Sequence, residues 1–119
     1  GLDVETASLA AIAARAAESK DGEAIEVLDV SGVFVICDAF VLVTGRTERQ
    51  VKALADEIEY QVREETGRTP RSVEGSDTLR WVLIDYGDVV IHILIEEDRG
   101  YYRLERLYGD VPRVDLARS

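Results

Sequence analysis

The amino-acid sequence predicts a single α/β (α+β) domain in which two main helices pack on one face of a sheet of about five strands. Three features predict this class: an apolar hairpin over Trp81–Glu97, an alanine-rich helix over Val4–Ser19, and an amphipathic helix that begins after Thr47. A chain of 119 residues fits one domain with one hydrophobic core, so we expect residues 1–119 to form a single domain.

The first element is the helix over Val4–Ser19. This stretch is rich in alanine, the best helix former, and its larger apolar residues recur at helical spacing. Asp3 or Thr6 is suited to cap the start of the helix, and Asp21-Gly22 ends it.

Two strands follow the first helix. Residues Glu23–Val30 alternate in the manner of a strand, and Ser31-Gly32 breaks it. The apolar run that comes next is too long for one strand, so we expect a turn over Val33–Ile36 and a buried strand over Ala39–Thr44.

The second helix has the clearest local signature in the chain. Thr47 with Gln50 forms a capping-box pattern, apolar residues follow at three- and four-residue steps, and Gly67 stands where the helix is expected to end. A short strand over Arg71–Glu74 comes next.

The hairpin consists of two apolar strands around the turn Asp85–Asp88. Alternation puts Trp81 and Asp85 on one face, and Val82 and Tyr86 on the other. A sheet with one wet face alternates apolar and polar residues, but here both faces are apolar. Because two helices cover one face and hardly two, we expect the second face to be left bare. Contiguous exposed apolar surface usually marks an interaction site.

The segment after the hairpin predicts a short C-terminal helix. Residues Asp98–Tyr108 carry apolar and aromatic side chains at near-helical spacing, and Gly109 ends the pattern. The tail Val111–Leu116, which contains Pro112, predicts an extended arm.

Composition narrows the class of partner. With 14 basic against 24 acidic residues the net charge is −10, and no basic run is present, so direct nucleic-acid binding is disfavoured and a basic partner is favoured. The sequence shows neither an apolar run of membrane-spanning length nor a signal-peptide pattern, and it has a single cysteine. We therefore expect a cytoplasmic protein without a membrane association.

The residues that most often carry chemistry favour structural interpretations. Cys37 and His92 are single in the chain, and a metal site or nucleophile would need further partners such as a histidine pair or a CxxC. Asp85 and Asp88 bracket a turn, where aspartate bonds nearby backbone, although two carboxylates can also hold magnesium. No cofactor is predicted. Trp81 suits two interpretations, a core aromatic or an interface anchor.

Several segments together carry a family resemblance. The chain resembles the ribosomal silencing factor family, also called RsfS or Iojap, in six motifs that occur in the same order. They are LDVSG at Leu28–Gly32, DAFVLVTG at Asp38–Gly45, ERQV at Glu48–Val51, VEG at Val73–Gly75, WVLIDYGDVVIH at Trp81–His92 and YRLERLYGD at Tyr102–Asp110.

The resemblance implies a mixed five-stranded sheet, related in shape to nucleotidyltransferases but without their catalytic residues. It also implies binding to the large ribosomal subunit through its ribosomal protein number fourteen. The resemblance further implies that this binding occupies the face of the large subunit where the small subunit would dock. The bound protein would then block subunit joining and silence translation when nutrients are scarce. Free members of the family are often dimers.

The expected contact residues lie on the hairpin and just before it. Trp81 and Val82 are expected to supply apolar contact, and Tyr86 an aromatic surface with a hydroxyl. Acceptors for a partner's arginine or lysine are expected from Asp85 and Asp88, and from Glu74 upstream. Two alternatives stay open: a nucleotidyltransferase-like enzyme that uses Asp85 and Asp88 around magnesium, and a homodimeric scaffold.

Overall fold

The computed structural model describes residues 2–33, 37–97 and 112–114. These residues form two helices and five strands, each at a position that the sequence predicts. In chain order they are α1 Val4–Ser19, β1 Glu23–Asp29, β2 Ala39–Gly45, α2 Glu48–Thr66, β3 Ser72–Glu74, β4 Trp81–Asp85 and β5 Val89–Ile95. The helix predicted over Asp98–Tyr108 lies outside the described residues.

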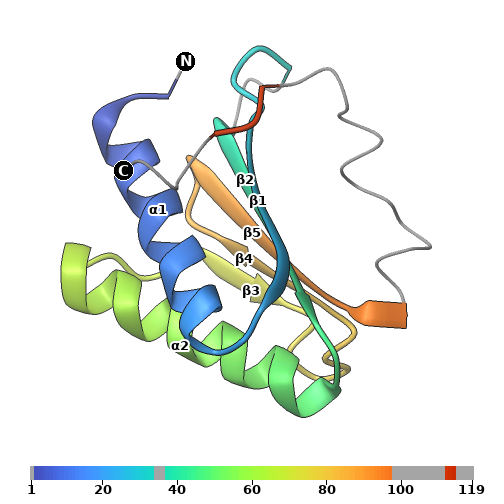
Figure 1. Ribbon diagram of the computed structural model, residues 1–119. Helices are drawn as coiled ribbons and strands as arrows, with labels where there is room; N and C mark the ends of the chain where they lie inside the picture. Colours follow the sequence, from blue (N-terminus) through green and yellow to red (C-terminus); the bar gives the residue numbers. More distant parts are fainter. Residues whose placement is uncertain (1, 34–36, 98–111, 115–119) are drawn as a thin grey trace.

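The five strands form one mixed sheet in the order β1-β2-β5-β4-β3. The central strands β2 and β5 run parallel, while every other neighbouring pair is antiparallel. Both helices lie on the same side of this sheet (Figure 1). The predicted α/β class with two helices on one face is therefore confirmed, and the likeness to nucleotidyltransferases stays a prediction.

Local capping fixes the helix ends. The Asp3 side chain accepts a hydrogen bond from the Thr6 backbone N–H at 2.8 Å and so caps α1. Thr47 caps α2 in the same way, accepting from the backbone N–H of Gln50 at 3.1 Å. Gly67 ends α2 in the left-handed conformation with φ of 77°.

The predicted capping box of α2 is only half formed, because the Gln50 side chain is used elsewhere. Its amide oxygen accepts from the Arg46 backbone N–H at 2.7 Å, and its NH₂ group donates to the carbonyls of Lys20 and Asp21. The start of α2 is thereby tied to the end of α1.

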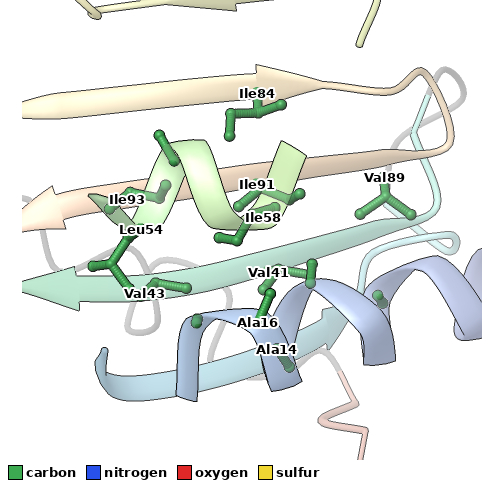
Figure 2. Packing of buried hydrophobic residues seen from close by; sticks show 14 of the residues in the cluster. Ala14, Ala16, Val41, Val43, Leu54, Ile58, Ile84, Val89, Ile91 and Ile93 are labelled. Atoms are coloured by element: carbon green, nitrogen blue, oxygen red, sulfur yellow. The ribbon is translucent and has the colours of Figure 1, made fainter. Parts of the chain in front are cut away.

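The main core lies between the helices and the sheet. Figure 2 shows Leu54 and Ile58 of α2 above Ile91 and Ile93 of β5, and small side chains of α1 near Val41 of β2. Alanines on α1 allow this helix to pack closely against the strands. Full burial of each large aliphatic side chain contributes about 1.5–3 kcal/mol, so this layer supplies most of the hydrophobic stabilisation.

The outer edge of β1 is paired by residues from the C-terminal tail. The Asp29 N–H donates to the Pro112 carbonyl at 2.8 Å, and the Val114 N–H donates to the Val27 carbonyl at 2.9 Å. The predicted extended arm is thus confirmed for residues 112–114, and it covers part of an otherwise open sheet edge. Neither helix of the described chain is long and apolar enough to cross a membrane.

Candidate functional site

Strand register assembles the candidate site on the side of the sheet that faces away from the helices, which we call the far face. One cross-strand row runs from Leu42 of β2 through His92 and Leu83 to Glu74 of β3. The neighbouring rows have the same order of strands. They are Phe40, Val90 and Asp85 on one side, and Thr44, Leu94 and Trp81 on the other.

Trp81 and His92 form a hydrogen-bonded pair in the middle of the far face. The indole Nε1 donates to the imidazole Nδ1 at 3.1 Å, and the two ring centroids are 5.9 Å apart. The ring of Phe40 meets the imidazole edge-on at 4.8 Å, with an interplanar angle of 75°. Aromatic groups from three different strands therefore meet at one place on the sheet.

The expectation of a bare far face is wrong at its centre. Leu28, Leu42 and Leu94 are completely buried, and His92 is 6% exposed. The far face has a hydrophobic cluster of its own, against which three half-buried side chains pack: Phe40, Trp81 and Val90. Counting helices alone overlooked this second cluster. Among the residues that the structure describes, these half-buried side chains and Leu83 supply the accessible apolar surface on the far-face side of β2, β5 and β4.

Two of the six expected contact residues lie on the helix side of the sheet. Val82 is 1% exposed and Tyr86 is 2% exposed, and both belong to the core beneath the helices. Alternation along β4 is the physical reason, since their Cβ atoms point away from the face that carries Trp81. This burial removes Val82 and Tyr86 from the candidate surface. Burial also raises the pKa of the Tyr86 phenol to about 12.

Asp88 is committed to contacts inside the fold, which corrects its expected role as an acceptor for a partner. One carboxylate oxygen accepts from Arg68 Nη2 at 2.8 Å, and the other accepts from Arg68 Nη1 at 3.2 Å and from the Thr6 hydroxyl at 3.0 Å. Burial opposes the charge, but the hydrogen bonds from Arg68 and Thr6 outweigh it and lower the pKa of Asp88. The carboxylate joins α1, the segment after α2 and the hairpin turn.

Asp85 and Glu74 remain on the edge of the far face. The Asp85 carboxylate accepts from the Gly87 N–H at 2.7 Å, as expected for a residue that begins a turn. A carboxylate accepts about four hydrogen bonds, so Asp85 keeps acceptor capacity for a partner. Glu74 is exposed at the end of the central row. Together they give the apolar surface an acidic margin.

The residues that suggested other chemistry are explained by packing. Cys37 is 6% exposed, its thiol donates to the Ala39 carbonyl at 3.3 Å, and burial raises its pKa. No group of three or more metal-ligating side chains is found in the part of the chain that the structure describes. With Asp88 paired to Arg68, Asp85 and Asp88 do not form the open carboxylate pair that a magnesium site would use.

Sequence reasoning named neither Phe40, Leu83 nor Val90 as a contact residue, although alternation places Leu83 on the face of Trp81 and Val90 on the face of His92. Alternation identifies Leu83 once Trp81 is chosen, but only the strand register shows that Phe40 of β2 and Val90 of β5 share this face. Arg68 was also missed, and no local signal predicts its pairing with Asp88.

The fold and the far face define a small α/β domain with helices on one side of a mixed sheet and an aromatic, acid-edged surface on the other. Residues 3–119 match the protein family described as "Ribosomal silencing factor during starvation". The chain belongs to this family.

Relatives and solved structures agree with this assignment. Ribosomal silencing factor RsfS of Bacillus subtilis is 43% identical over 109 residues, which cover 92% of each chain. A crystal structure of a Chromobacterium violaceum protein has a TM-score of 0.82 and 32% identity, covering 91% of this chain and 88% of that chain. A crystal structure of a Bacillus halodurans protein has a TM-score of 0.76 and 36% identity, covering 95% of this chain and 99% of that chain.

Proposed function

We propose that this protein binds the large ribosomal subunit through ribosomal protein number fourteen and represses translation when nutrients are limiting. The bound domain occupies the face where the small subunit docks, so that the two subunits cannot join. This action is steric and needs no catalytic residue. The names of the relatives, which are silencing factors, are consistent with a regulatory protein.

The observation that supports this proposal is the composition of the far face. Trp81, Leu83 and Phe40 offer half-buried apolar and aromatic surface, and Glu74 and Asp85 supply acidic acceptors at its margin. An aromatic anchor with charged groups around it is the usual composition of an interface hot spot. A net charge of −10 favours a basic partner such as a ribosomal protein.

The binding step is tested by sedimentation through a sucrose gradient. Purified large subunits are expected to carry the protein into their peak, whereas small subunits alone are not. Large subunits depleted of ribosomal protein number fourteen serve as the matched control and are expected to leave the protein at the top. Equal binding to both subunits would contradict the proposal.

The steric step needs a separate measurement. Large subunits incubated with the protein before small subunits are added are expected to remain separate in the gradient, while ribosomes already joined are expected to resist the protein. If the protein binds and joining still proceeds at the normal rate, the steric mechanism is wrong while the binding step stands.

Self-association of the free protein is part of the same proposal. If a second copy packs on the far face, it competes with the ribosomal protein for the same surface. Analytical ultracentrifugation should then show a dimer that large subunits dissociate. A dimer that persists on the subunit would place self-association on a different surface.

A further inference from the structure

We infer that His92 is a positioning residue, which holds the Trp81 indole in the orientation that the partner of the far face recognises. This inference rests on the proposed function, and it adds a role for a residue that makes no large contact surface of its own. With only 6% of its surface exposed, His92 acts through Trp81 rather than by touching the partner.

The geometry of the pair supplies the first step. Trp81 lies opposite Leu94 in the β4–β5 ladder and Leu83 lies opposite His92, so Trp81 and His92 are diagonal neighbours on one face. The indole Nε1 has only a hydrogen to donate, so His92 Nδ1 is the acceptor of the 3.1 Å hydrogen bond. The imidazole is therefore neutral, with its proton on Nε2.

The backbone of Trp81 is fixed independently of its side chain. A Cβ atom built on Gly75 would lie 2.1 Å from the Trp81 carbonyl oxygen, so the loop after β3 packs directly on this peptide group. The indole itself turns about two side-chain bonds, and its ring is only half-buried. The hydrogen bond to His92 adds a directional constraint that apolar packing does not give.

Fixing the indole in advance favours binding. A side chain that is already ordered loses less conformational entropy when the partner arrives, which raises affinity without any new contact. Phe40 packs edge-on against the imidazole at 4.8 Å and so holds His92 in place in turn. A chain of three rings, from Phe40 through His92 to Trp81, thus connects β2, β5 and β4.

The test compares two amide variants. In His92→Asn the amide is reached by the same number of bonds as Nδ1, so it can still accept from the indole, whereas in His92→Gln the amide lies one bond further out. Both replacements bury a similar polar group. Their comparison therefore separates the position of the acceptor from the general effect of changing a buried histidine.

The first readout is the indole N–H signal of Trp81 in a ¹⁵N-labelled protein. The chain has a single tryptophan, so the signal needs no assignment by mutation. His92→Gln is expected to move this signal upfield and to speed its exchange with water, while His92→Asn leaves it near the wild-type position. The second readout is affinity for large subunits, expected to fall about three- to tenfold in His92→Gln alone, the factor that one net hydrogen bond supplies.

Three results would overturn the inference: an unchanged indole signal in His92→Gln, a changed signal with unchanged affinity, or no recovery in His92→Asn. If neither variant folds, the wild-type protein still decides the pairing, because its single histidine must show an unprotonated Nδ1 and a protonated Nε2 in its ¹⁵N shifts. If wild-type protein fails to bind large subunits, the proposed function is rejected, and so is the claim that His92 affects binding. The indole signal would still test the Trp81–His92 hydrogen bond independently.

Discussion

Gly75 packs against the main chain of Trp81 at a distance that excludes any side chain. A Cβ on Gly75 would lie 2.1 Å from the Trp81 carbonyl oxygen, and the φ of Gly75 is +83°. Both conditions require glycine, one through space and the other through backbone conformation. The glycine therefore sets the position of β4 at the residue that begins the candidate surface.

Replacing Gly75 with alanine is expected to destabilise the fold more than the same change at Gly67. Gly67 also has a positive φ, +77°, but a Cβ there would meet nothing within 4 Å. The control, Gly67→Ala, should therefore lose only the conformational cost of a positive φ, about 1–2 kcal/mol. Gly75→Ala should lose more, because its Cβ also clashes with the Trp81 backbone. Urea unfolding measures both variants. Equal losses would show that the loop moves aside easily.

Asp88→Asn tests whether this partly buried carboxylate holds the three segments together. The amide keeps the shape but loses the charge, and a hydrogen bond to a charged group contributes about 2 kcal/mol, so a loss of that order is expected at pH 7. Asp56→Asn is the matched control. Asp56 pairs with Lys52 on the surface, where 64% of its side chain is exposed, and its loss should be below about 1 kcal/mol.

The stabilisation by Asp88 has a predictable pH dependence. Its folded-state pKa lies below that of the unfolded chain, which is about 3.9 for aspartate. The stabilisation is therefore present above about pH 4 and is lost as the pH falls through the folded-state pKa. Wild-type protein and Asp88→Asn should approach each other in unfolding free energy below pH 4 and converge once the pH is below the folded-state pKa of Asp88. A constant difference down to low pH would assign the effect to packing.

Glu59→Gln is expected to raise the unfolding free energy at pH 7, whereas Asp88→Asn is expected to lower it. Burial, followed by repulsion from Asp56, raises the pKa of Glu59, so folding favours its protonated form. That contribution is present below the unfolded-state pKa of about 4.3 and is lost as the pH rises through the folded-state pKa. At pH 7 the neutral amide should stabilise the protein by up to about 0.5 kcal/mol.

The control for Glu59→Gln is Glu64→Gln, an exposed position on the same helix, where little change is expected. Urea midpoints at pH 7 and pH 4 compare the two variants. A midpoint for Glu59→Gln that falls at pH 7 would show that the carboxylate is stabilised in the folded protein.

The elements were predictable because each carries a local signal. Asp3, Thr47 and Gly67 mark helix ends through capping, and the hairpin is marked by a glycine turn between β-branched strands. The order of the strands could not be predicted in the same way, because the parallel pairing of β2 with β5 joins segments that are far apart in the chain. No local pattern predicts such a pairing.

The candidate site was predictable only in part for the same reason. Alternation separates Trp81 from Val82, but it does not say which of the two faces the helices cover. Asp88 illustrates the other difficulty, since its partner Thr6 lies 82 residues away in the sequence. Charge and turn position alone made Asp88 resemble a surface acceptor.

Salt should weaken association with large subunits mainly through the rate of encounter. The acidic margin of Glu74 and Asp85 and the overall charge of −10 attract a basic partner electrostatically, and salt screens this attraction. Association rates measured by stopped-flow between low and physiological salt should fall, while dissociation rates change little. Rates that do not depend on salt would remove the electrostatic support for a basic partner.

Trp81→Ala is expected to weaken binding to large subunits by about 2 kcal/mol or more, because a few residues, often tryptophan, contribute most of the binding energy of an interface. Tyr60→Ala is the matched control. Tyr60 is 48% exposed on α2, on the helix side of the sheet, so its loss should leave binding unchanged. Cosedimentation measures both variants after urea unfolding has shown that they fold. If Tyr60→Ala impairs binding and Trp81→Ala does not, the partner meets the helices, and the far face is not the docking surface.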